Sequence, residues 1–178
     1  MKCLVTGATG FLGTNLVHEL VKAGWDVKAF GLPGSNARYI DDLPVELVYG
    51  DIINKSDVEK AVKGCDYVFH VAGDTSWWNK RFDKQREINV IGVVNVAQAC
   101  IKFGVKRLVH TSTVDSLGYN PYGIADESWE NYNYAKTGYN YADTKREGEL
   151  SLKPLVKRGL DYVVIYPGSM LGPFDFTL

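Results

Sequence analysis

The chain has 178 residues, of which 46% are hydrophobic and 23% are charged, and its formal net charge is −1. This is the composition of a soluble globular protein, and the lack of a basic surplus argues against nucleic acid or an anionic membrane as the main partner. No apolar stretch approaches the ~20 residues that cross a bilayer, so we expect no membrane span, and we expect no signal peptide.

Short β-branched segments alternate with longer segments of helical periodicity. The expected strands are residues 2–6, 26–30, 45–49, 66–72, 105–112 and 160–166, and the expected helices are residues 11–24, 55–64, 81–103 and 141–158. Strands that are nearly all apolar are buried on both faces, which favours a parallel sheet with helices on both sides. Right-handed crossovers then predict an α/β, doubly wound (Rossmann) fold of six strands, with residues 1–178 as one dinucleotide-binding domain.

The three cysteines and three histidines are scattered along the chain, at Cys3, Cys65, Cys100, His18, His70 and His110. Their spacing fits neither a metal site nor a disulfide framework. We therefore expect no metal, buried cysteines and a reduced, cytoplasmic location.

The turn between the first strand and the first helix is rich in glycine. Gly7, Gly10 and Gly13 have the spacing G-x-x-G-x-x-G. Gly7 allows a tight turn, Gly10 lets the backbone approach a pyrophosphate, and Gly13 lets the helix pack close to the sheet. The N-terminus of the helix adds unpaired N–H groups and a positive dipole, so this junction predicts a dinucleotide site.

Six segments in chain order resemble the extended short-chain dehydrogenase/reductases, which include epimerases, dehydratases and dihydroflavonol-reductase-like enzymes. They are "TGATGFLG" (6–13), "GDI" (50–52), "HVAG" (70–73), "NVIGVVNV" (89–96), "HTSTVDSLG" (110–118) and "YPGSMLGP" (166–173). Gly73 stands where this family usually has a second Ala. On residues alone, Asp51 could instead cap a turn and Asn89 could be a buried polar group in a helix.

The resemblance implies NAD or NADP as cofactor, held by residues of these segments and of the helix after the fifth strand. The implied contacts are Gly7, Thr9, Gly10, Phe11, Leu12, Gly13, Asp51, Ile52, Val71, Ala72, Gly73, Tyr141, Lys145, Pro167 and Gly168. At the end of the second strand, Gly31 and Leu32 replace the acidic residue of NAD-preferring relatives and the Arg of NADP-preferring ones. Because no carboxylate repels a 2′-phosphate and Ser35, Asn36 and Arg38 lie nearby, we lean slightly to NADP, although Arg38 could simply be solvated.

Two Tyr-x-x-x-Lys pairs compete for a catalytic role. Tyr141–Lys145 lies on the expected helix after the fifth strand, where residues four apart share a face, and this is where the family has its active-site pair. Tyr132–Lys136 lies in the long polar stretch of residues 114–138, without a helix to align it. We therefore assign catalysis to Tyr141–Lys145.

The chemistry expected of this pair is proton transfer. A nearby ammonium should lower the pKa of the Tyr141 phenol, which could then exchange a proton with a substrate hydroxyl or carbonyl. The resemblance implies that Lys145 also bonds the nicotinamide ribose and that Thr113, rather than its neighbour Ser112, donates to the substrate oxygen. Nicotinamide would carry the hydride.

The substrate is harder to predict, because in the family much of the substrate-binding lobe follows the sixth strand and this chain is expected to stop before it. Trp77 and Trp78 could line an apolar pocket or pack against that lobe. The favoured function is an NAD(P)-dependent reductase or dehydrogenase acting on a small molecule. An epimerase stays open, a dehydratase is disfavoured because Val114 replaces an expected Asp, and a non-catalytic dinucleotide sensor is the third class. Apolar surface left by an absent lobe could also make a homodimer.

Overall fold

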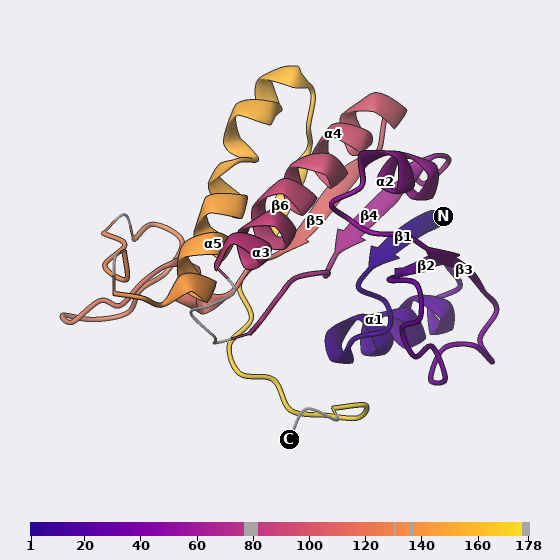
Figure 1. Cartoon of the computed structure of the whole chain (residues 1–178), viewed down its shortest axis with the longest axis horizontal. Helices are drawn as coiled ribbons and strands as arrows, with labels where there is room; N and C mark the ends of the chain where they lie inside the picture. Colours follow the sequence, from indigo (N-terminus) through magenta and orange to yellow (C-terminus); the bar gives the residue numbers. More distant parts are fainter. Residues whose placement is uncertain (77–81, 130, 136, 176–178) are drawn as a thin grey trace.

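The computed structural model describes residues 1–76, 82–129, 131–135 and 137–175, and its centre is a six-stranded parallel sheet in the order β3-β2-β1-β4-β5-β6 (Figure 1). The strands are β1 (Lys2–Thr6), β2 (Asp26–Gly31), β3 (Val45–Tyr49), β4 (Tyr67–His70), β5 (Arg107–Thr111) and β6 (Tyr162–Ile165). This order has its switch point between β1 and β4, so the doubly wound fold is confirmed.

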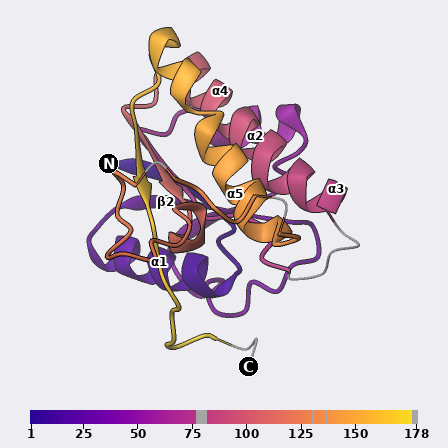
Figure 2. The ribbon, with the colours of Figure 1, turned by 90° about the vertical axis from the view of Figure 1, so that its left-hand side faces the viewer.

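Helices cover both faces of the sheet, as Figure 2 shows. They are α1 (Phe11–Lys22), α2 (Lys55–Val62), α3 (Phe82–Arg86), α4 (Val93–Phe103) and α5 (Asn140–Leu150), with a π-helical segment η2 (Glu87–Gly92) and 3-10 segments η3 (Val114–Ser116) and η4 (Lys153–Arg158). Helix α1 lies on one face, and α2, α4 and α5 lie on the other. Within the described ranges, none of these helices has the length and apolarity that crossing a membrane requires.

Two apolar clusters form the core, one on each face of the sheet. The first joins sheet residues such as Leu4 and Leu108 to α2 and α4, and the second joins Val5 and Val27 to Val17 of α1. The three cysteines are free and buried within these clusters. The prediction of buried cysteines is thereby confirmed, and burial raises the pKa of each thiol, to about 12 for Cys3 and Cys100.

Burial on both faces holds for the inner strands but not for the two edge strands. On β6, Val163 and Ile165 are 42% and 44% exposed, although both are apolar. On β3, Glu46 and Tyr49 face solvent. An edge strand has a neighbour on one side only, and helix α1 packs on β1 and β2, away from the β6 edge (Figure 1).

The helix expected over residues 81–103 is interrupted. Its described part runs as α3, then the π-helical segment η2, then α4. Close packing accompanies the wider turn: a Cβ at Gly92 would lie 2.7 Å from Ile52, and one at Gly148 of α5 would overlap the Asn89 carbonyl. π-Helical turns often occur at functional sites, and this one carries Asn89.

The helix expected over residues 141–158 is also shorter than predicted. α5 ends at Leu150, and the chain continues as the 3-10 segment η4. Pro154 stands at the start of η4, where its ring and missing N–H are incompatible with a continuing α-helix. The C-terminal half of the expected helix is therefore a separate short element that leads into β6.

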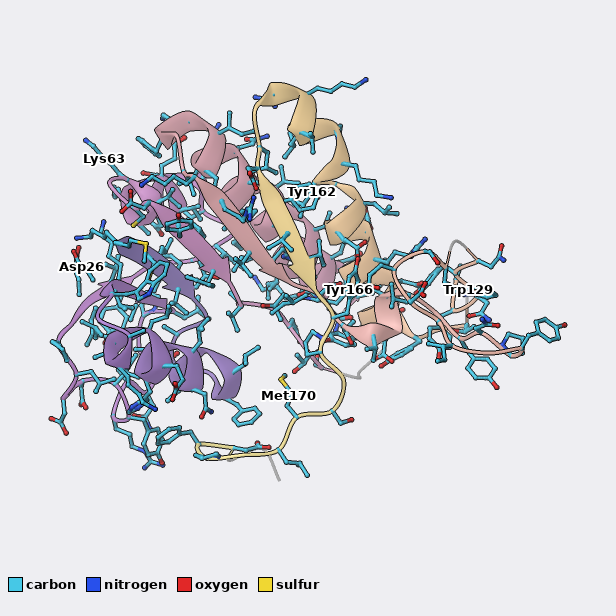
Figure 3. The ribbon with its side chains drawn as sticks, turned by 180° about the vertical axis from the view of Figure 1, so that it is seen from behind. Asp26, Lys63, Trp129, Tyr162, Tyr166 and Met170 are labelled. Atoms are coloured by element: carbon cyan, nitrogen blue, oxygen red, sulfur yellow. The ribbon has the colours of Figure 1, made fainter. Side chains whose placement is uncertain are left out.

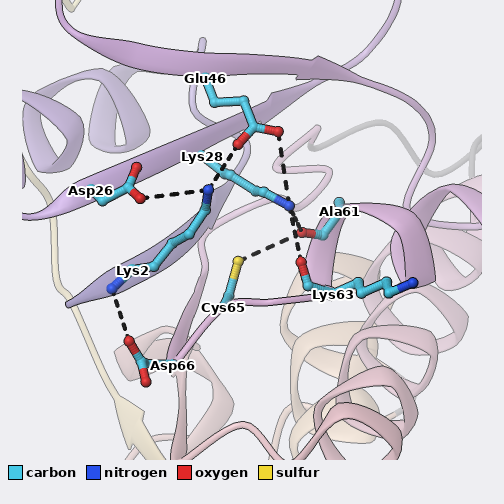
Figure 4. Close-up of polar contacts among 8 residues, drawn as sticks. All are labelled: Lys2, Asp26, Lys28, Glu46, Ala61, Lys63, Cys65 and Asp66. Carbon is cyan, nitrogen blue, oxygen red and sulfur yellow. Dashed lines mark hydrogen bonds and ion pairs between the residues drawn. The ribbon is translucent and has the colours of Figure 1, made fainter.

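A charge network at the amino ends of the strands joins β1, β2 and β3 to α2 (Figure 4). Lys28 is only 8% exposed, and its Nζ donates to the carbonyl oxygens of Ala61 (3.2 Å) and Lys63 (3.0 Å). These carbonyls end α2, where the helix dipole favours a cation. Glu46 lies 3.9 Å from the same ammonium and 3.0 Å from that of Lys2.

We predict that Lys28→Met lowers the free energy of unfolding by about 1–3 kcal/mol, because the buried Ala61 carbonyl, the part-buried Lys63 carbonyl and Glu46 lose a charged partner. Urea denaturation would measure the change. Lys63→Met is the matched control, since the Lys63 side chain is exposed and points away from the network in Figure 4. Equal stability losses in the two variants would contradict this account of Lys28.

Candidate functional site

A cleft of about 580 Å³ opens at the carboxyl ends of the strands, across the switch point between β1 and β4. This is where open α/β sheets bind ligands, and the volume is in the range of small-molecule sites. Every site residue that the sequence predicts, apart from Arg38, lines this cleft. Ser35, which the sequence placed near the 2′-phosphate, also lines the cleft, and the lining residues that the sequence analysis did not select include Thr75, Lys84, Ile88 and Met170.

The glycine turn forms one wall of the cleft. Gly7 has φ +68°, and a Cβ there would lie 2.7 Å from the Ala72 nitrogen, while a Cβ on Gly13 would overlap the Gly7 carbonyl. A Cβ on Gly10, in contrast, would meet nothing closer than the Gly7 oxygen at 3.4 Å. Gly7 and Gly13 are thus required by the fold, whereas the bare face of Gly10 lines the cleft.

The first turn of α1 fits an anion such as a pyrophosphate. α1 begins at Phe11 without a side-chain cap, and the residue before it is Gly10. The first N–H groups of a helix have no partner within the helix, and they carry its positive dipole. Together with the bare Gly10, they provide the donors and the space that the phosphates of a dinucleotide need.

Asp51 combines the two roles that the sequence left open, since it caps a turn and also lines the cleft. Its Oδ1 accepts a hydrogen bond from the Ile53 nitrogen (3.1 Å), which caps the turn before α2. The residue also lines the cleft next to Ile52. A structural role in the turn therefore does not remove Asp51 from the expected adenine end of the site.

Tyr141, Lys145 and Thr113 meet at the other end of the cleft. Tyr141 and Lys145 lie one turn apart on α5, and Thr113 follows β5. Thr113 forms a side-chain hydrogen bond with Tyr141. The Lys145 ammonium is 6% exposed and donates to the Thr111 carbonyl at 2.6 Å.

The pKa of Tyr141 differs from the sequence-based expectation. Burial raises it, and the hydrogen bond from Thr113 only partly offsets this, so Tyr141 is a protonated phenol at neutral pH. The expected lowering by the Lys145 ammonium is absent, because that ammonium is directed to the Thr111 carbonyl. Burial lowers the pKa of Lys145 itself to about 8, against an opposing effect of the Glu149 charge.

The competing tyrosine is engaged elsewhere. Tyr132 lies outside the helices, as expected, and its hydroxyl donates to Asp143 Oδ1 at 2.6 Å. Burial and this carboxylate raise the pKa of Tyr132 strongly. Its intended partner, Lys136, lies outside the described residues, as do Trp77 and Trp78.

Asn89 ties the end of β4 to α5. Its Oδ1 accepts from the Asp74 nitrogen (2.8 Å), and its Nδ2 donates to the Asp74 carbonyl (3.0 Å) and to Thr144 Oγ1 (3.1 Å). Gly73, the departure from the family pattern, lies in the same place. A Cβ there would be 3.2 Å from Asn89 Oδ1 and 3.7 Å from Lys145 Nζ, so the glycine leaves room beside the ammonium.

Two buried histidines lie side by side on β4 and β5. The rings of His70 and His110 are stacked with centroids 5.5 Å apart. Thr6 Oγ1 accepts from the Val71 and Ala72 nitrogens, so its own hydrogen points to His70 Nδ1 at 2.7 Å and leaves the His70 proton on Nε2. Burial, followed by the Lys145 charge, lowers the pKa of both rings, to about 3 for His70.

Arg38 is held away from the cleft lining. Its guanidinium hydrogen-bonds the Tyr39 hydroxyl and lies 4.4 Å from the centre of the Tyr39 ring. Ser35 lines the cleft beside Gly31 and Thr9. The NADP preference based on Arg38 therefore stays a prediction. In the part of the chain that is described, no cluster of three His, Cys, Asp or Glu residues could hold a metal ion.

Comparison with known protein families identifies the family of this chain. The model of the NAD dependent epimerase/dehydratase family matches residues 3–178. The chain belongs to this family. The resemblance to extended short-chain dehydrogenase/reductases is thereby confirmed.

The names of similar proteins state several different activities. Sterol demethylase protein B of Methylococcus capsulatus is 35% identical over 99% of this chain and 53% of its own length. A 2-alkyl-3-oxoalkanoate reductase of Stenotrophomonas maltophilia is 34% identical over 100% of this chain and 53% of its own. The structure of Thermus thermophilus UDP-glucose 4-epimerase in complex with NAD has a TM-score of 0.80 and 26% identity, covering 93% of this chain and 54% of that one. The chain thus spans about half the length of these proteins.

The buried histidines predict a specific acid sensitivity. An unfolded histidine takes up a proton near pH 6.5, whereas folded His70 does so only near pH 3. Between these values the unfolded state binds more protons, so stability is fully present above pH 6.5 and falls by about 1.4 kcal/mol per pH unit per histidine below it.

Urea unfolding at pH 7 and pH 5.5 would measure this slope. His110→Gln should reduce this loss of stability by the contribution of one histidine, because the unfolded chain then has one fewer imidazole to protonate. A stability that does not change between the two pH values would show that the pair is not held neutral.

Proposed function

We propose that this chain binds a nicotinamide dinucleotide and belongs to an NAD(P)-dependent reductase that transfers hydride between the nicotinamide and a carbonyl or secondary hydroxyl group. The observation that carries the proposal is that Thr113, Tyr141 and Lys145 lie in the same cleft as the glycine turn. A proton donor, a cation and a hydroxyl donor next to a phosphate-binding turn match what this chemistry requires.

The residues present would hold the cofactor along the cleft. The first turn of α1 and Gly10 would take the pyrophosphate, Asp51 and Ile52 the adenine end, and Lys145 a ribose hydroxyl. Nicotinamide would supply the hydride. We keep the slight preference for NADP, which Ser35 and the absence of a carboxylate at Gly31 still support, whereas Arg38 lies outside the cleft lining.

The protonation state of Tyr141 favours the reductive direction. A carbonyl that receives hydride becomes an alkoxide and needs a proton, and a phenol with a raised pKa is present in the form that can supply one. Thr113 would donate to the same oxygen and stabilise its negative charge as it develops. After Tyr141 has given its proton to the substrate, Lys145 would help to replace that proton. For this, the bound cofactor would have to orient the Lys145 and Tyr141 side chains toward each other, because the ammonium here donates to the Thr111 carbonyl.

An epimerase is the second candidate, since it would use the same groups for oxidation followed by reduction on the other face of the substrate. The epimerase structure cited above supports it by fold, at 26% identity. The reductase has more support because a relative named as a reductase is 34% identical over the whole chain. Net consumption of NAD(P)H with substrate distinguishes the two, because an epimerase regenerates its cofactor.

We predict that Gly10→Val abolishes binding of NADP and NAD while the chain stays folded. The new side chain has room on the protein side but projects into the space assigned to the pyrophosphate. Calorimetry on wild type and variant tests this, with circular dichroism as the check on folding. Gly13→Val is the contrasting variant, and it should unfold. Unchanged affinity in Gly10→Val would refute the cofactor assignment, and tighter binding of NAD than NADP would refute the preference.

We further predict that Tyr141→Phe lowers kcat by about 10²–10⁴ and leaves cofactor affinity almost unchanged, in a form of the protein that turns over a carbonyl substrate. Thr113→Val should also lower kcat, and Lys145→Met should lower kcat and weaken cofactor binding. Tyr132→Phe is the matched control, because its hydroxyl is committed to Asp143. Loss of activity in Tyr132→Phe but not in Tyr141→Phe would overturn the mechanism.

A further inference from the structure

Glu149 is a buried carboxylate to which no role has been assigned so far. It lies near the end of α5 and is 9% exposed. Its Oε1 accepts a hydrogen bond from the Tyr166 hydroxyl at 2.9 Å, and its Oε2 lies 3.3 Å from Ser112 Oγ and 3.2 Å from Ser116 Oγ. Figure 3 labels Tyr166 where β6 ends, so this one carboxylate connects α5 to the segments after β5 and β6.

The hydroxyl hydrogens can be counted. Ser112 and Ser116 lie 3.0 Å apart, and Ser116 Oγ also lies 2.8 Å from the Thr113 carbonyl. If Ser116 donates to that carbonyl, Ser112 donates to Glu149; if Ser116 donates to Glu149, Ser112 donates to Ser116. In either arrangement each oxygen of Glu149 receives one hydroxyl hydrogen, which suits an acceptor-only carboxylate.

These contacts fix the turn that carries Thr113. Ser112 and Ser116 flank Thr113 on both sides, and Arg146, also on α5, donates to the Ser116 carbonyl at 2.8 Å. The Val114 nitrogen donates to the Pro167 carbonyl at 3.1 Å. The Thr113 turn is therefore held against α5, the helix that carries Tyr141.

Glu149 also lies one turn beyond Lys145. Tyr141, Lys145 and Glu149 are spaced by four residues and so occupy one stripe of α5. The groups that face Lys145 from the packed strands, His70 and His110, are neutral at neutral pH, and the same cleft contains a second cation, Lys84. Within the part of the chain described, the negative charge that acts on the buried ammonium is that of Glu149.

We propose that Glu149 is a positioning residue of the Tyr141–Lys145–Thr113 site, which keeps Lys145 protonated inside the protein and locks the Thr113 turn onto α5. The inference rests on the proposed function for its catalytic meaning, because Lys145 and Thr113 take their roles from it. The effect on Lys145 is a property of the unliganded chain, so it can be measured without any cofactor or substrate.

The test is a titration of the lysine side chains by ¹³C NMR at Cε, in the 178-residue chain, with the Lys145 signal assigned from its loss in Lys145→Met. The wild-type Lys145 midpoint should lie at about pH 8. Glu149→Gln keeps the shape and an acceptor oxygen but removes the charge. It should lower the midpoint by about one to two pH units, the effect expected of one charge at helical i,i+4 distance in a partly screened site.

Two further variants separate charge from structure. Glu149→Asp keeps the charge on a shorter arm, and Tyr166→Phe removes one donor but leaves the carboxylate, so both should keep the Lys145 midpoint within about half a pH unit of wild type. A Glu149→Gln midpoint equal to wild type, or Asp and Phe variants that lower it as much as Gln does, would overturn the inference. If Glu149→Gln does not fold, Glu149→Ala takes its place: a midpoint lowered by about one pH unit or more supports the charge role, and a midpoint near pH 8 refutes it.

The dinucleotide affinity of the same variants connects this result to the proposed function. In wild type the affinity should weaken as pH rises through about 8, because the ammonium donor is lost, and in Glu149→Gln the same weakening should occur at lower pH. A wild-type chain that binds no dinucleotide would refute the proposed function but not the Lys145–Glu149 coupling. If the Lys145 midpoint shifts but the pH dependence of dinucleotide affinity is identical in the two proteins, the cofactor-binding role of Lys145 is refuted and the coupling stands.

Discussion

A buried ammonium is the constraint to which the rest of the site adapts. Lys145 is almost completely removed from solvent, and an isolated charge in such a place is costly. The chain compensates with the Thr111 carbonyl, which accepts directly, and with the Glu149 carboxylate one turn away. The two histidines beneath it remain uncharged, which avoids adding like charges next to the lysine. The end of β5 and helix α5 thus both provide groups that stabilise the single buried ammonium of Lys145.

Close approach between backbones makes this arrangement possible, and glycine provides it at several points. Gly148 lets α5 touch the Asn89 carbonyl, so the Asn89 amide can bridge the end of β4 and Thr144. Gly13 does the same for α1 against the Gly7 turn. Glycine within a helix lowers helix stability, by about 1 kcal/mol relative to alanine. Here that cost is offset by contacts that bring Lys145 and the first turn of α1 to opposite sides of one cleft.

The sequence predicted most of the sheet and most of the cleft because both depend on local patterns. Apolar strands, a glycine turn and a Tyr-x-x-x-Lys on a helix are visible in single segments, and the predicted lining residues other than Arg38 lie together. What escaped prediction depends on packing between distant segments. The π-helical turn at Asn89 reflects contacts with Ile52 and Gly148, and the raised pKa of Tyr141 reflects burial that no local pattern encodes. A signal for Glu149 was present, since it extends the Tyr141–Lys145 spacing by one more turn, but its meaning appears only when Tyr166 and Ser116 lie beside it.

The two ends of the cleft have different physical origins. The end at the glycine turn is made of strand ends and helix starts, whose positions follow from the sheet. At the other end, Thr113 and Tyr141 line the cleft, while the long segment between them lies outside the lining and extends beyond the start of α5 in Figure 1. There Tyr132, Tyr134, Tyr139 and Tyr141 contact one another in succession, with ring centroids 5.7–6.2 Å apart. Tyr139 also donates to Asp115 Oδ2, which lies 3.5 Å from Thr113 Oγ1, so the turn that carries Thr113 is linked to this aromatic series. Under the proposed function, a change in that segment would act on the substrate end of the site rather than on the glycine turn that would hold the dinucleotide, since fold and function are specified by different parts of the chain.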